Sequence, residues 1–193
     1  MDKDYLDILH RKLQMWSVSF APGLTDEEVS QIEARYGFRF PPDLRAFLQY
    51  ALPISSSWVN WRDDAEEKIR SRLDWPAEGI CFDIQHNDFW MDTFGPKPAD
   101  LEEAFRIARQ AVANAPRLIP ILSHRYLPDE PNLAGNPVFS VYQTDIIHYG
   151  YDLASYFANE FRIDPEKLPD HYLPCPEWAA KSPHPIRFWD QFL

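Results

Sequence analysis

The chain has 193 residues, a length that suits one domain with a sizeable core. Its content of 45% hydrophobic and 15% aromatic residues is typical of a globular protein and excludes a disordered chain. The formal charge of −11 argues against nucleic-acid binding, because phosphate recognition needs clustered Lys and Arg. The same charge suits a basic protein partner, since opposite charges speed encounter. The alternative is an acidic surface that only maintains solubility.

The two cysteines, Cys81 and Cys175, lie far apart and form no C-x-x-C pair. We therefore expect free thiols, with no zinc site and no redox motif. Residues 1–16 carry charges throughout and lack the apolar core of a signal peptide. No stretch approaches the ~18 apolar residues of a membrane span. The sequence thus predicts a cytoplasmic protein that does not bind membranes.

The first elements are the most explicit part of the chain. Residues 4–16 predict a helix with one apolar face, and a loop follows at 17–23. Thr25 and Glu28 then have the spacing of a capping box, in which each side chain accepts from the other residue's backbone amide. Gly37 ends this second helix, because glycine adopts the left-handed conformation at low cost.

A short extended link and a third helix complete this unit. Phe38 and Phe40 alternate with a polar residue, which predicts an extended segment with one apolar face. Pro42 can occupy the first position of a helix, where a missing amide costs nothing. The apolar stripe of that helix consists of Leu44, Phe47, Leu48 and Ala51.

The run Y-G-F-R-F-P-P-D-L-R-A-F-L after a capped helix resembles the signature of the SUKH superfamily. This superfamily contains fungal cell-wall-synthesis regulators and many bacterial immunity proteins. The similarity is close over residues 22–52 and looser over residues 117–161. It implies an α+β fold in a single domain spanning 1–193, with a mainly antiparallel mixed sheet and helices packed against it. It also implies a protein-binding module rather than an enzyme.

The middle of the chain contains a charged segment and an alternating one. The run RDDAEEKIRSRLDW predicts an exposed helix with charge pairs such as Glu66–Arg70, and we interpret residues 53–79 as an insertion into the family pattern. In residues 79–90, Ile80, Phe82 and Ile84 alternate with less apolar residues, which predicts a strand.

The C-terminal half predicts a helix, a set of strands and a last helix. The expected elements are helix 100–114, strand 118–122, loop 123–136, strand 137–142, its hairpin partner over 146–150 and helix 152–161. Pro120 favours an edge position for the first of these strands. Residues 162–193 are rich in proline but also in aromatic residues, so we expect a strap that lies across the domain surface.

No established catalytic or phosphate-binding motif is present. His86, Asp88 and Trp90 would share one face of the expected strand, and a His-x-Asp pair can serve as a base with its orienting carboxylate or as two metal ligands. The alternative is a polar strand end, since the pair lacks a third ligand or a nucleophile. A hydrolase that uses His86 and Asp88 is one functional hypothesis.

A second group of titratable residues comprises His124, Asp145 and His148. The last two would share a face only on a helix, whereas their apolar neighbours favour a strand. We therefore expect a turn aspartate and a surface histidine. The sequence predicts no catalytic residue, no metal ligand and no cofactor.

Aromatic and acidic residues gather in the middle of the chain. Trp58, Trp61, Trp75 and Trp90 lie near four acidic residues, and aromatic anchors ringed by charge are typical of protein interfaces. At least half of these tryptophans are expected in the core. The residues predicted to bind a partner are Trp58, Trp61, Asp63, Asp64, Glu66, Glu67, His86, Asp88 and Trp90. The predicted function is that of an immunity protein that binds a basic toxin domain, and the alternative is a regulatory scaffold of the fungal type.

Overall fold

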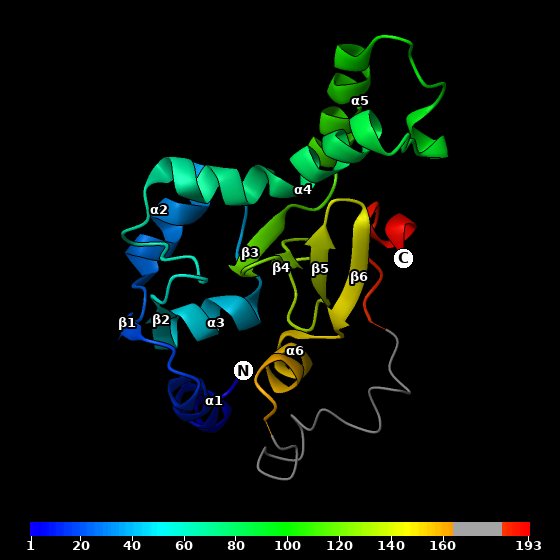
Figure 1. Ribbon diagram of the computed structural model, residues 1–193. Helices are drawn as coiled ribbons and strands as arrows, with labels where there is room; N and C mark the ends of the chain where they lie inside the picture. The colour runs from blue at the N-terminus through cyan, green and yellow to red at the C-terminus, as the bar shows by residue number, and fades with distance from the viewer. Residues whose placement is uncertain (164–182) are drawn as a thin grey trace.

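The computed structural model describes residues 1–163 and 183–193 and shows an α+β fold, as predicted (Figure 1). The α-helices are α1 (Lys3–Met15), α2 (Asp26–Tyr36), α3 (Pro42–Tyr50), α4 (Glu66–His86), α5 (Leu101–Ala113) and α6 (Leu153–Glu160), and two short 3-10 helices are η1 (Asp92–Phe94) and η4 (Trp189–Phe192). The strands are β1 (Phe20–Pro22), β2 (Ala51–Pro53), β3 (Leu118–Leu122), β4 (Arg125–Pro128), β5 (Val138–Tyr142) and β6 (Asp145–Gly150). Among the helices described, none is long and apolar enough to cross a membrane.

The predicted unit of two helices and an extended link is confirmed. The Thr25 hydroxyl accepts from the Glu28 amide at 3.1 Å, and the Glu28 carboxylate accepts from the Thr25 amide at 2.8 Å. Gly37 ends α2 with a φ of 71°, in the left-handed region. Pro42 is the first residue of α3, and both phenylalanines of the link are buried.

All strand pairs within the described residues are antiparallel. β1 pairs with β2, and the larger sheet has the order β3-β4-β5-β6, in which each strand neighbours the next along the chain. Pro120 lies on the edge strand β3, as predicted, where its missing amide hydrogen leaves no neighbouring strand unpaired. The loop predicted over 123–136 is wrong in part, because it contains β4. All four residues of β4 are buried, so the strand lacks the alternating pattern of buried and exposed residues. Turn-forming residues on both sides also favoured the prediction of a loop.

The strand predicted over residues 79–90 is wrong, because α4 continues to His86. Ile80 and Ile84 are four residues apart, a spacing that puts them on one face of a helix as well as one face of a strand. Phe82 lies between them and is 45% exposed, whereas Cys81 is buried beside Ile80. That pattern is helical, and it aims Phe82 at solvent. The insertion assigned to residues 53–79 comprises β2's last residue, a loop and the first part of α4.

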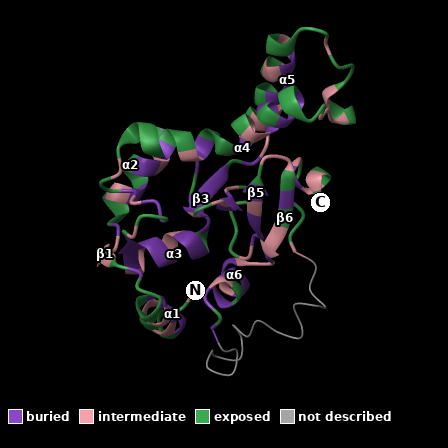
Figure 2. Cartoon of the chain, in the orientation of Figure 1, coloured by how far each residue is buried: buried purple, intermediate pink, exposed green. Residues whose placement is uncertain are grey.

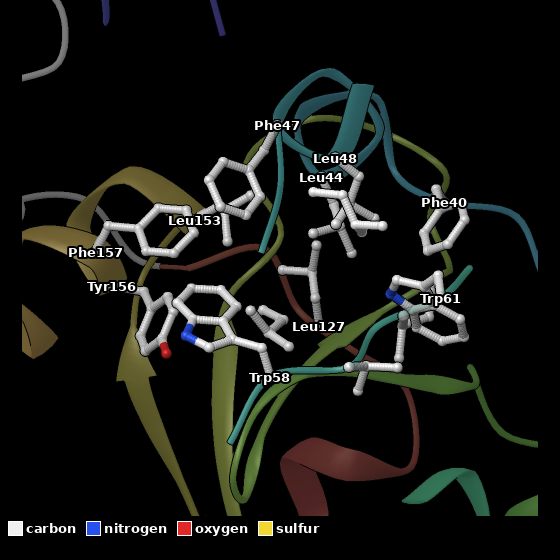
Figure 3. Close-up of a cluster of buried hydrophobic side chains, with 14 of the residues drawn as sticks. Phe40, Leu44, Phe47, Leu48, Trp58, Trp61, Leu127, Leu153, Tyr156 and Phe157 are labelled. Atoms are coloured by element: carbon white, nitrogen blue, oxygen red, sulfur yellow. The ribbon is translucent and has the colours of Figure 1, made fainter. Parts of the chain in front are cut away.

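Two hydrophobic clusters hold these elements together, and buried residues line both faces of the larger sheet (Figure 2). The first cluster joins α1, α2, α3 and α6; part of it, including Phe47, Trp58 and Phe157, is drawn in Figure 3. The second cluster joins the C-terminal half of α4 and α5 to the other face of the sheet. Figure 1 shows α5 and the loop that precedes it, between α4 and α5, projecting beyond the sheet.

The C-terminal segment belongs to the second cluster. Trp189 is 1% exposed, and its indole Nε1 donates to the Pro116 carbonyl at 2.6 Å. This residue makes the segment 183–193 part of the core, which is more than the surface strap predicted from composition. The rest of that prediction, together with the free thiol expected at Cys175, falls on residues outside the described ranges. Cys81 is a buried free thiol, as expected.

Candidate partner-binding surface

Two of the four tryptophans predicted near the interface are core residues. Trp58 is 3% exposed and stacks on Phe161 with ring centroids 6.1 Å apart. Trp61 is 5% exposed and meets Phe40 edge to face at 5.3 Å (Figure 3). The prediction that at least half of these tryptophans are core is therefore confirmed. The prediction of Trp58 and Trp61 as surface anchors is wrong, because neither indole reaches the surface.

The four predicted acidic residues surround the beginning of α4. Asp64 pairs with Lys68 at 2.6 Å, and Glu66 forms the predicted pair with Arg70 at 2.7 Å. Asp63 and Glu67 are exposed. These two ion pairs neutralise part of the charge here, while Asp63 and Glu67 have no ion pair among the described residues.

His86, Asp88 and Trp90 do not share the face that was predicted. His86 is the last residue of α4, where its ring lies 4.4 Å from that of Phe82. Asp88 follows the helix with a φ of 52° and forms an ion pair with Lys97. Strand alternation is absent here, because the chain is helical up to His86. Within residues 1–163 and 183–193, no group of three or more His, Cys, Asp or Glu is placed to hold a metal ion.

The second titratable group is also dispersed. The His124 ring lies 3.2 Å from the Ser123 hydroxyl in the β3–β4 turn. Asp145 is exposed at the start of β6, as expected of a turn aspartate. His148 is half-buried on the same strand, three residues further along and therefore on the opposite face. Its Nε2 lies 3.7 Å from an oxygen of Asp190 in the C-terminal segment.

The outer face of α4 carries exposed aromatic residues among acidic ones. Trp75 and Phe82 are each 45% exposed and lie seven residues apart, which places them on one side of the helix. Glu67, Asp74 and Glu78 are exposed on the same side, and so is Lys68, seven residues before Trp75. Large aromatic residues at such exposure are the anchors that interfaces use, and the surrounding charge forms a polar rim.

The tip of the β5–β6 hairpin packs beside this face. The Trp75 indole donates to the Val141 carbonyl at 3.3 Å, and Tyr142, the next residue, is 57% exposed. The backbone of Gln143 lies close to Gly79. A Cβ added to Gly79 would be only 2.8 Å from the Cα of Gln143. We define the α4–hairpin surface as Glu67, Asp74, Trp75, Glu78, Phe82, Tyr142 and Asp145.

A buried carboxylate fixes the hairpin against α4. Asp83 is 4% exposed and accepts from both the amide and the hydroxyl of Thr144. Burial acts to raise the pKa of Asp83, but these bonds and one from Asn87 outweigh it and lower the pKa. Asp83 is therefore an ionised anchor that holds the hairpin tip in place beside Trp75.

The sequence pattern missed most of this surface. Phe82 was assigned to a strand interior, and Tyr142, Asp74 and Glu78 were not selected. A helical reading of residues 66–86 would have found the outer face, since its exposed positions recur at helical spacing. Comparisons with protein-family models, with curated proteins and with solved structures each found no match.

Proposed function

We propose that the chain is a non-enzymatic module that binds a basic protein through the α4–hairpin surface. The observation that carries the proposal is the pair Trp75 and Phe82, two large aromatic side chains exposed on one face of α4 with charged residues around them. Such residues contribute most of the binding energy in protein interfaces, while charge at the rim speeds encounter. The overall charge of −11 favours a basic partner over an acidic one.

The role best supported within this class is that of an immunity protein that neutralises a toxin. The support is the resemblance to the SUKH superfamily over residues 22–52, together with the acidic surface. The regulatory scaffold is the alternative, and it predicts a partner with no toxic activity. The hydrolase hypothesis has lost its motivation, because His86 and Asp88 do not share a face and Asp88 pairs with Lys97.

A capture experiment with matched variants tests the proposal. Tagged wild-type protein and the variants Trp75→Ala, Phe82→Ala and Trp16→Ala are used to capture partners from the source organism. Trp16 is the control, since it is 52% exposed but lies at the end of α1, outside the surface. We expect a basic protein that Trp16→Ala retains and that the other two variants bind with affinity lower by ~2 kcal/mol, about thirtyfold.

The partner's activity then separates the two roles. An immunity protein abolishes the toxicity of its partner at a one-to-one ratio, whereas a scaffold partner is not toxic. Equal retention by all variants, or recovery of nucleic acid in place of protein, would rule out the proposed surface.

A further inference from the structure

A cleft of about 630 Å³ lies on the flank of α4 next to α5. This volume is within the range of about 300–1,000 Å³ that is usual for ligand-binding sites. Its walls come from the middle of α4, the last turn of α5, the start of β3, the residues after β4 and the C-terminal segment. Segments from distant parts of the sequence thus meet at one concave place.

Part of the cleft wall is apolar. It is lined by Leu73, Pro76, Val112, Ala115, Leu118 and Trp189. Such a wall can pack against hydrocarbon, including the aliphatic stem of a long charged side chain.

Two arginine residues at the cleft form ion pairs with glutamate residues. Arg109 pairs with Glu78 at 3.2 Å, and Arg187 pairs with Glu130 at 3.1 Å.

The third guanidinium, that of Arg117, donates to the Tyr36 carbonyl at 2.6 Å. Arg109 and Arg187 are thus paired with carboxylates, whereas Arg117 is bonded to a neutral carbonyl and keeps its charge. In the described part of the chain, the carboxylates of Asp74 and Asp129 form no ion pair. Asp129 accepts the Arg117 amide at 2.7 Å. Four carboxylates and three guanidinium groups line the cleft, so its formal charge is negative by one.

We propose that this cleft receives a Lys or Arg side chain of the basic partner, with its stem along the apolar wall and its cationic end at Asp129 and Asp74. The identity of the partner rests on the proposed function, whereas the chemistry of the cleft does not. Asp74 and Glu78 belong both to the cleft and to the α4–hairpin surface. A protein that lies across α4 is thus placed to insert a side chain on this flank.

The protonation of Asp129 gives the proposal a pH signature. Burial raises the pKa of Asp129 to about 6, and Glu130 acts in the same direction, while Arg117 opposes both. The other charged groups at the cleft are Asp74, Glu78, Arg109 and Arg187. A cation binds the ionised carboxylate better than the neutral acid, so binding should strengthen as the pH rises from 5 to 7.

The test uses the full chain and a small probe, N-acetyl-arginine amide, followed by amide chemical shifts in two-dimensional NMR. We expect saturable shifts at Leu118 and Asp129, and binding weaker by about tenfold at pH 5 than at pH 7. N-acetyl-norleucine amide, which lacks the charge, should bind more weakly.

Three variants complete the test. Asp129→Asn keeps the acceptor for the Arg117 amide and should weaken probe binding about fivefold to tenfold. Ala113→Phe fills the cleft from the exposed end of α5 and should abolish binding without altering the thermal melt. Asp4→Asn, on the exposed side of α1, removes the same charge elsewhere and should bind like the wild type.

The outcomes separate this inference from the proposed function. Probe binding that Asp129→Asn and Ala113→Phe leave unchanged, or tighter binding of N-acetyl-glutamate amide, would overturn the cleft assignment even if partner capture succeeds. If capture fails while the probe binds as described, the cleft assignment stands and the proposed function does not.

Discussion

Gly37 shows how one residue fixes the end of a helix. A Cβ added there would meet nothing nearer than Arg117 Nη1 at 3.6 Å, so a side chain fits the space but not the backbone, whose φ is 71°. Gly37→Val should therefore lower the free energy of unfolding by roughly 1–2 kcal/mol through strain alone. Gly37→Asn is the matched control, since asparagine tolerates this conformation, and it should lose less. Urea denaturation measures both, and equal stability of the two variants would contradict the backbone explanation.

Asp129 makes the stability of the protein depend on pH. Its pKa is about 6 in the folded state, above the ordinary value of 3.8, so the folded state binds more protons between these values. The contribution of this residue to the free energy of unfolding therefore falls as pH rises from 4 to 6. Asp129→Asn should match the wild type at pH 4 and exceed it at pH 7 by about 1–2 kcal/mol, after allowance for partial exposure.

Urea titrations at the two pH values measure this difference. Asn at position 129 keeps the acceptor for the Arg117 amide, so the comparison isolates the charge. A variant that is less stable than the wild type at pH 7 would show that the ionised carboxylate stabilises the fold.

At the scale of elements, the sequence predicted both ends of α2 correctly but not the C-terminal end of α4. Thr25 and Gly37 act within one turn of the chain, so their capping roles were readable from sequence. The spacing of Ile80 and Ile84 fits both a helix and a strand, and only burial against α5 and the sheet distinguishes them. α4 also contains Pro76, a residue that is rare in helix interiors, so its length departs from local propensity.

The error carried over to the candidate site. A strand placed His86, Asp88 and Trp90 together, whereas the helix separates them and exposes Phe82. Tyr142 was assigned correctly to a strand, but its place beside Trp75 depends on tertiary packing of the hairpin on α4. Contacts of this kind leave no local pattern in the sequence.

The contact between α4 and the hairpin can be tested through Gly79. Alanine in place of glycine inside a helix usually stabilises by about 0.5–1 kcal/mol. Here the new Cβ would lie 2.8 Å from the Gln143 Cα, a backbone atom, so Gly79→Ala should destabilise. Ser71→Ala, on the exposed face of the same helix, is the control and should show no such loss. Thermal unfolding followed by circular dichroism measures both, and a more stable Gly79→Ala would contradict the close packing.

At the scale of the whole molecule, the family resemblance implied the α+β class and composition predicted the acidic surface, but neither predicted how the chain closes. The buried position of Trp189 joins the C-terminal segment to Pro116, over seventy residues earlier. The proline content suggested a strap, since it excludes long regular elements. Trp189 packs among residues of α4, α5 and the sheet. These elements come together only in the folded molecule, so the sequence does not show where the aromatic residue packs.

The charge of the whole molecule and its local anchors should affect different rate constants for partner binding. The charge of −11 acts at long range, so association should slow as salt rises and the Debye length shrinks from ~10 Å at 0.1 M to ~3 Å at 1 M. Glu67→Gln together with Asp74→Asn should reduce the association rate and leave dissociation nearly unchanged, because rim charges act during encounter.

Trp75→Ala should instead speed dissociation about thirtyfold, corresponding to ~2 kcal/mol, because the indole contacts the partner only after docking. Surface plasmon resonance with the captured partner at two salt concentrations separates these effects, and Trp16→Ala serves as the control for loss of an exposed indole. An association rate that does not respond to salt would show that the acidic surface plays no part in recognition.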